Sequence, residues 1–269
     1  MNLRMIVYIL GKMLGVEAAV LLIPAFVSAI NNGEDYQAFL LTSAVLALIC
    51  FLTARKRPKD STIYGKEGLV IVAVAWVLWS LFGALPFTLS GSIPHYIDAF
   101  FETVSGFTTT GSTILREIES LPKGILFWRA LTHWIGGMGV LVFVMMLTSL
   151  EDKNAMHLMR AEVPGPEADK LVPKARNTAK ILYGMYFALT VLEVIFLLFG
   201  KMNLYDSIVH SFSTAGTGGF SNWNNSVAYY NSAYIDGVIT VFMILFGVNF
   251  NIYFLLLLKQ FKAAFHNEE

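Results

Sequence analysis

The chain has 269 residues, of which 56% are hydrophobic and only 14% are charged, and its mean hydropathy is +0.61. Soluble domains carry about a quarter charged residues, so these proportions favour a polytopic membrane protein over a soluble domain. Nineteen basic residues balance nineteen acidic ones, which excludes the strong cationic field of a nucleic-acid-binding protein. The single cysteine, Cys50, lies in an apolar run, where we expect a packing residue rather than a disulfide partner.

Six stretches are long and apolar enough, or nearly so, to cross a bilayer, which takes about 20 residues of helix. The first contains Lys12 and Glu17 and ends in Val27-Ser28-Ala29, so a cleaved signal peptide is the alternative to a membrane span. We expect a span, because the two charged residues would spoil the apolar region of a signal peptide. The predicted spans are residues 5–30, 37–54, 68–89, 125–148, 178–200 and 235–258.

The basic residues predict how the chain is oriented. They gather in the linker 54–66, in the loop 151–180 and after the last span, whereas 31–37 is acidic. Loops rich in Lys and Arg stay on the cytoplasmic side of a membrane. The pattern therefore predicts that both termini are cytoplasmic and that segments 90–124 and 201–234 face outward.

Both outward segments interrupt the apolar sequence with hydroxyl groups and glycines. The stretches are "SGFTTTGSTI" (105–114) and "FSTAGTGGFS" (212–221). Each follows a short apolar segment, 93–107 or 204–213, that cannot reach across a bilayer and is typical of a re-entrant helix. We expect a helix that enters the membrane halfway and a Thr/Gly strand that returns.

The two halves of the chain repeat the same order of elements. A span, a short helix, a Thr/Gly stretch and a second span occur twice, and Gly111 and Gly218 align at an offset of 107 residues. Because both halves begin on the same side, the repeats are parallel and are expected to pack around an axis along the membrane normal. A central pore can form on such an axis.

Thr/Gly strands at the end of a short helix have the parts of a potassium filter. Backbone carbonyls can replace the water around K⁺, glycine permits the backbone angles this needs, and the negative end of the helix dipole favours a cation. The alternative is that each cluster is a turn or a small-residue helix contact. The predicted filter residues are Thr108, Thr109, Thr110, Gly111, Ser112, Ala215, Gly216, Thr217, Gly218 and Gly219, with K⁺ held by the carbonyls of Thr109, Thr110, Gly216 and Thr217.

Several polar residues near these strands have open roles. Glu102 either hydrogen-bonds behind the first strand or raises the local cation concentration, and Asn249 either bonds across helices or faces the vestibule below the filter. Arg129 is expected near the outer interface, either snorkelling to the surface or paired with an acid such as Glu117 or Glu119. Acid–base groups for a membrane-embedded enzyme, His133, His210 and Glu193, are present, but this hypothesis requires them to converge on one site.

The sequence resembles the Trk/Ktr/HKT superfamily of potassium transporters, and within it the bacterial TrkH-type membrane subunit. The resemblance rests on "FFETVSGFTTTGST" (100–113), "LPKGILFWRALTHWIGGMGVLVF" (121–143), "SFSTAGTGGFSNWNNS" (211–226) and "GVNFNIY" (247–253). It implies helix–pore-loop–helix units in which Gly111 and Gly218 are the single filter glycines of units one and two. It also implies a K⁺ uptake protein in the bacterial cytoplasmic membrane, not an enzyme, with no cofactor.

The expected fold is an all-α polytopic membrane protein, a helix pair plus two parallel helix–re-entrant pore loop–helix repeats. The expected domains are 1–66 (helix pair and basic linker), 67–150 (pore unit one), 151–176 (cytoplasmic loop) and 177–269 (pore unit two).

The superfamily carries four pore units in one polypeptide, and this sequence contains two. We therefore expect either a fragment of a longer chain or a half-size subunit whose second copy supplies the other two units. A non-conducting assembly subunit is the alternative function. The partners implied by the resemblance are the two remaining pore units, a second copy in a homodimer, and a cytosolic nucleotide-binding regulatory subunit, with no nucleic acid.

Overall fold

A computed structural model of the chain describes residues 2–60, 64–139 and 175–257. Every regular element in these ranges is a helix, which confirms the all-α prediction. The elements are α1 (Leu3–Val20), α2 (Leu22–Ile30), α3 (Tyr36–Ala54), α4 (Gly65–Gly83), α5 (Leu85–Leu89), α6 (Tyr96–Phe107), α7 (Lys123–Met138), α10 (Ala175–Phe199), α11 (Leu204–Ala215), the 3₁₀ helix η1 (Ser226–Tyr230), α12 (Ala233–Gly247) and α13 (Phe250–Leu257).

Four stretches of the described residues are long and apolar enough to cross a membrane. They are Leu3–Ile30, Tyr36–Ala54, Lys66–Leu89 and Lys180–Phe199, and they match the first, second, third and fifth predicted spans. The first stretch contains α1 and α2, joined at Leu21 with helical backbone angles. The fourth predicted span begins as α7. Residues 140–148 of that span, and the predicted loop 151–176 up to residue 174, lie outside the described residues.

The sixth predicted span is two helices rather than one. The helix α12 ends at Gly247, Val248 is extended with φ −72° and ψ 139°, and α13 begins at Phe250. Glycine and asparagine are weak helix formers, and the carbonyl of Asn249 accepts the Ile252 N–H at 2.9 Å to start the new helix. Asn249 therefore lies at a break in the backbone.

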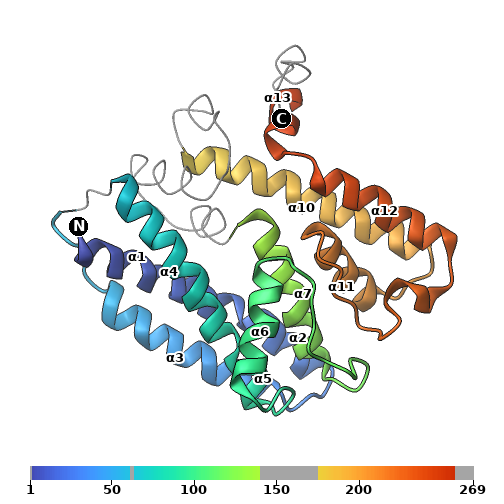
Figure 1. The fold of residues 1–269 in the computed structure, drawn as a ribbon, viewed down its shortest axis with the longest axis horizontal. Helices are drawn as coiled ribbons and strands as arrows, with labels where there is room; N and C mark the ends of the chain where they lie inside the picture. Colours follow the sequence, from blue (N-terminus) through green and yellow to red (C-terminus); the bar gives the residue numbers. More distant parts are fainter. Residues whose placement is uncertain (1, 61–63, 140–174, 258–269) are drawn as a thin grey trace.

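The arrangement places α7 at the centre (Figure 1). The blue and cyan helices α1, α3 and α4 lie on one side of it, and the yellow to red helices α10 and α12 lie on the other. The short helices α6 and α11 both pack directly against α7, and α2 covers α7 as well. One helix thus carries the short helices of both repeats.

The short helices fix the register of the repeat. Both α6 and α11 have twelve residues, and their first residues, Tyr96 and Leu204, are 108 positions apart. The offset is therefore 108 and not the 107 obtained by aligning Gly111 with Gly218. With this correction the structure has the predicted fold class, a helix pair followed by two parallel repeats of helix, short helix, loop and helix.

Candidate functional site

The two Thr/Gly segments leave their short helices with the same backbone path. Thr109 and Thr217 both have φ +54°, and Gly111 and Gly219 have φ +73° and +86°. The N–H of Thr110 donates to the Ser105 carbonyl at 2.9 Å, and the N–H of Gly218, 108 positions later, donates to the Ser213 carbonyl at 3.1 Å. The backbone counterpart of Gly111 is therefore Gly219, and the predicted pairing with Gly218 is wrong.

This register also changes which carbonyls correspond. Ala215 is the last residue of α11 and is buried, and Gly216 matches Thr108 at the helix end. The counterparts of the Thr109 and Thr110 carbonyls are those of Thr217 and Gly218, rather than those of Gly216 and Thr217. The sequence prediction pairs the two segments by placing Gly111 opposite Gly218. The structure pairs them by the hydrogen bonds that each segment makes to the end of its own short helix, and these place Thr110 opposite Gly218.

The two segments approach each other at their glycines. A Cβ added at Gly111 would collide with the carbonyl oxygen of Gly218, so the two backbones are in contact there. Thr110 and Ser112 of the first segment and Gly219 of the second are exposed. The loops therefore form two adjacent walls with accessible backbone, as two sides of a pore would.

Hydroxyl groups support the first segment from within. The Ser105 hydroxyl donates to the Ser112 carbonyl at 2.6 Å, which joins the last turn of α6 to the far end of the segment. The hydroxyls of Thr108 and Thr110 lie 2.8 Å apart. The abundance of Ser and Thr in this stretch therefore has a structural cause besides any contact with an ion.

Glu102 lies behind the first segment, which is the first of the two roles considered for it. Its side chain is buried, and its carboxylate accepts hydrogen bonds from the Thr113 hydroxyl at 2.8 Å and from the Ile114 N–H at 3.0 Å. The equivalent residue in repeat two is His210, whose Nε2 lies 3.1 Å from the Ser221 hydroxyl oxygen. In both repeats, therefore, a side chain of the short helix lies within hydrogen-bonding distance of the hydroxyl group just beyond the Thr/Gly segment, Thr113 in the first repeat and Ser221 in the second.

Arg129 joins the two repeats, and the predicted pairing with Glu117 or Glu119 is wrong. Its Nε lies 2.5 Å from a Glu102 oxygen, and its Nη1 donates to the Ser221 carbonyl at 3.1 Å. Its guanidinium also lies 3.6 Å from the centre of the Phe220 ring. The side chain is 3% exposed, so this is a buried ion pair rather than an interfacial one. Sequence reasoning missed it because α7 and α6 meet only in the folded chain.

The glycines near the end of α7 let both short helices come close. A Cβ at Gly136 would collide with the Phe107 carbonyl, and a Cβ at Gly137 would lie 3.0 Å from the Ala215 carbonyl oxygen. These carbonyls are at the negative C-terminal ends of α6 and α11. Two helix dipoles therefore converge on the same level of α7, and the glycines of α7 allow both short helices to approach it.

Replacing Gly136 with alanine is expected to destabilise the fold by about 2 kcal/mol, because overpacking a fixed backbone contact costs about 1–3 kcal/mol. Thermal unfolding of the purified protein in detergent measures this as a lower Tm. The matched control is Gly184→Ala on α10, where an added Cβ meets nothing within 4 Å. An equal loss in both variants would contradict the close contact.

Asp206 organises the outer end of the second loop. Its carboxylate accepts hydrogen bonds from Tyr230 at 2.7 Å, Asn203 at 2.8 Å, Asn222 at 2.9 Å and Trp223 at 3.3 Å. Burial alone would raise the pKa of Asp206, but these four donors outweigh it and hold the pKa below its ordinary value of 3.8. The charged form therefore ties the start of α11 to the loop beyond the segment.

A carboxyl group whose pKa is lowered in the folded state stabilises the fold above its unfolded pKa, and the contribution is lost as pH falls through the native pKa. We expect Asp206 to contribute fully above about pH 5 and to lose its contribution below about pH 4. Unfolding of the protein and of Asp206→Asn, measured from pH 6 to pH 3, should show a smaller pH dependence in the variant. Parallel curves for the two proteins would contradict this role.

Two of the three residues of the enzyme hypothesis, His133 and His210, make structural contacts. His133 stacks on Phe220 with ring centres 4.0 Å apart. The ring nitrogens of His210 lie 2.8 Å from the Asp206 carbonyl and 3.1 Å from the Ser221 hydroxyl. Glu193 is completely buried in α10. The contacts of the two histidines join helices and loops to one another.

Most of the chain matches a known protein family. The TrkH family, described as cation transport protein, matches residues 36–266. The chain belongs to this family. The Trk system potassium uptake protein TrkH of Escherichia coli K12 is 38% identical over 260 residues, which is 96% of this chain and 54% of that protein. An uncharacterized cation transporter of Methanocaldococcus jannaschii is 32% identical over 231 residues, 86% of this chain and 48% of that protein.

A solved structure agrees with the TrkH-family fold. The crystal structure of the potassium transporter TrkH from Vibrio parahaemolyticus superposes with a TM-score of 0.81 and 31% identity, covering 94% of this chain and 52% of that one. The chain thus spans about half the length of the relatives it matches. As a TrkH-family member with four span-length helices in its described part, it is a multi-pass membrane protein of a transporter family and not an enzyme.

Proposed function

We propose that this chain supplies two pore units of a potassium uptake protein and that its Thr/Gly segments form two walls of the filter. The observation that carries the proposal is the matched backbone of Thr109–Gly111 and Thr217–Gly219, brought into contact by two short helices on one central helix. The names of the relatives, potassium uptake protein and potassium transporter, support K⁺ as the ion.

The proposed mechanism is passive conduction of dehydrated K⁺. Carbonyl oxygens of Thr109, Thr110, Thr217 and Gly218 replace part of the water shell, and the C-terminal dipoles of α6 and α11 favour positive charge at the inner end. The membrane potential drives entry, at about 2.3 kcal/mol per charge per 100 mV. The basic segments support an orientation with both termini in the cytoplasm of a bacterial cell.

Two walls do not enclose an ion, so we propose that two further pore units complete the filter. The relatives, which are about twice as long, support a source in the same polypeptide, and a second copy in a homodimer is the other source. The relatives are named as parts of a Trk system, which supports assembly with other subunits, and we propose a cytosolic nucleotide-binding regulatory subunit as one of them. A non-conducting assembly subunit is the alternative function.

Growth of bacteria that lack potassium uptake systems tests the proposal. A full-length protein that carries this chain should restore growth in low potassium, and residues 1–269 alone should restore it only if two copies assemble. Failure of the full-length protein to take up rubidium, although it is present in the membrane, would overturn the transport proposal. Uptake by 1–269 as a purified monomer would overturn the need for further pore units.

A further inference from the structure

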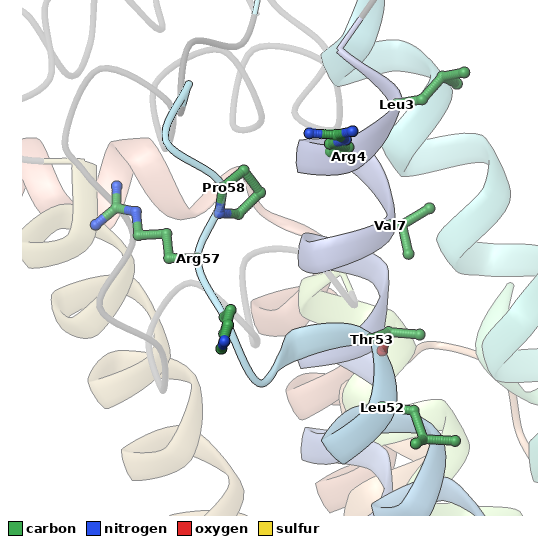
Figure 2. Close-up of a pocket in the computed structure, with 8 residues that line it drawn as sticks. Leu3, Arg4, Val7, Leu52, Thr53, Arg57 and Pro58 are labelled. Carbon is green, nitrogen blue, oxygen red and sulfur yellow. The ribbon is translucent and has the colours of Figure 1, made fainter.

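A pocket of about 530 Å³ lies where the start of α1 meets the end of α3. Figure 2 shows that it is bordered by the first turns of α1 on one side and by the chain that leaves α3 on the other. Its volume falls within the roughly 300–1,000 Å³ typical of small-molecule sites. The residues that concern us are Leu3, Arg4, Val7, Leu52, Lys56 and Arg57.

One part of the pocket is apolar and exposed. Leu3, Val7 and Leu52 are 61%, 49% and 70% exposed. All three lie on helices long and apolar enough to cross a membrane, within the last turns of the spans. At that depth an exposed aliphatic side chain faces the acyl chains of lipids rather than water.

The other part of the pocket is cationic. Arg4, Lys56 and Arg57 line it, all three are exposed, and no acidic residue is among the residues that line it. Arginine and lysine are the side chains that bind phosphate groups, and basic pockets between helices at the cytoplasmic surface bind lipid headgroups. At each helix end a basic residue lies farther from the middle of the span than an aliphatic one, Arg4 before Val7 and Lys56 after Leu52, so positive charge lies at the membrane surface and these aliphatic side chains lie below it.

Hydrogen bonds hold the two sides of the pocket together. The Asn2 side-chain amide donates to the Asp60 carbonyl at 3.0 Å, and the Asn2 N–H donates to a Glu67 carboxylate oxygen at 3.3 Å. The same Glu67 carboxylate accepts the Tyr64 N–H at 3.2 Å. The start of α1 is therefore tied to the chain between α3 and α4, and the pocket does not have to be assembled by its ligand.

We propose that this pocket binds one anionic phospholipid, with the headgroup phosphate at Arg4 and Lys56 and an acyl chain along Val7 and Leu52. A soluble phosphate compound would leave the exposed aliphatic side chains unused, and an apolar helix of a partner protein would bury the charges of Arg4 and Lys56. The proposal rests on the proposed orientation, which places this end of the spans in the anionic cytoplasmic leaflet. It does not rest on potassium conduction.

The experiment measures lipid binding directly. The full-length protein carrying this chain is purified in a neutral detergent and titrated with phosphatidylglycerol or with phosphatidylcholine of the same acyl chains, and bound lipid is counted by native mass spectrometry. Glycerol phosphate, which lacks acyl chains, is the third probe. The test variant is Arg4→Gln/Lys56→Gln, and the matched control is Arg116→Gln/Lys201→Gln, two exposed basic residues in the opposite, predicted outward-facing segments.

A basic residue near an anionic surface is worth about fivefold in affinity, so the test variant should bind phosphatidylglycerol about 25-fold more weakly, while the control stays within about twofold of the unmodified protein. Phosphatidylcholine should bind more weakly than phosphatidylglycerol, and glycerol phosphate should not compete. Equal losses in test variant and control, or no preference for phosphatidylglycerol, would overturn the proposal. Competition by glycerol phosphate would assign the site to a soluble anion instead. None of these readouts depends on ion flux.

Discussion

Replacing Gly111 with alanine in a full-length protein that carries this chain is expected to abolish selective K⁺ uptake. Gly111 has φ +73°, a conformation that costs a side-chained residue about 1–2 kcal/mol, and its new Cβ would also collide with the Gly218 carbonyl. The backbone strain alone corresponds to about a tenfold change in the rate of uptake. The collision also displaces the Gly218 carbonyl, which we propose binds the ion. Rubidium uptake and the K⁺/Na⁺ uptake ratio in potassium-deficient cells measure the effect.

The chain offers variants that separate strain from position. Gly219→Ala introduces the same kind of strain at φ +86° with nothing within 4 Å of the new Cβ, so it should reduce selectivity less than Gly111→Ala. Gly91→Ala is the matched control, because Gly91 has φ +75°, is equally open and lies outside both segments. Uptake by Gly91→Ala should stay within about twofold of the unmodified protein. A normal K⁺/Na⁺ ratio in Gly111→Ala would falsify the filter assignment.

Replacing Arg129 with glutamine is expected to destabilise the protein by about 3–5 kcal/mol and to lower the K⁺/Na⁺ ratio of what remains folded. The change leaves the buried Glu102 carboxylate without its counter-charge, which is the expensive way to break a buried ion pair. It also removes the hydrogen bond from α7 to the Ser221 carbonyl and the contact of the guanidinium with the Phe220 ring, on which His133 of α7 also stacks. Thermal unfolding and rubidium uptake against sodium measure the two effects.

A double variant distinguishes charge from position. Glu102→Gln/Arg129→Gln removes both charges, so it should recover part of the stability lost in Arg129→Gln. It should not recover the selectivity, because Ser221 and Phe220 still lose their contacts with the Arg129 guanidinium. Arg116→Gln, which changes an exposed arginine, is the control and should alter neither quantity. If the double variant were as unstable as Arg129→Gln and conducted with normal selectivity, the bridge between the repeats would have no role in the filter.

The short helices and the Thr/Gly loops could be predicted because their signals are local. A twelve-residue apolar segment before a run of Thr and Gly is visible in one window of sequence, and its repetition gives the order of elements. The register was off by one residue because "GTGG" offers three glycines to match with the one in "TTTGST". The hydrogen bonds from Thr110 and Gly218 to the preceding helices, together with the matching backbone angles, show which glycine is equivalent.

The contacts that hold the loops in place could not be predicted, because they join residues far apart in the chain. The sequence predicts that Arg129 pairs with an acid near it in the chain, whereas its partner Glu102 is 27 residues away on another helix. The correct offset carries a signal that could have found part of this network. It aligns Glu102 with His210 and Thr113 with Ser221, so a hydrogen-bonding pair recurs at the same spacing in both repeats.

Hydropathy also misjudged the last span. Residues 235–258 are mostly apolar, and their one charged residue, Asp236, lies at the start, so a hydropathy window predicts one helix. The chain instead breaks at Val248, where Gly247 and Asn249 lower the cost of leaving the helix. A single weak helix former would be tolerated in a membrane span, but two around one extended residue are enough to divide it.

The most direct test of the filter is a structure of the full-length protein, carrying this chain, grown with thallium in place of potassium. We predict an anomalous peak at the carbonyl oxygens of Thr109 and Thr110, shared with those of Thr217 and Gly218. A map with thallium bound elsewhere, and with these carbonyls packed against helices without a passage beside them, would contradict the account.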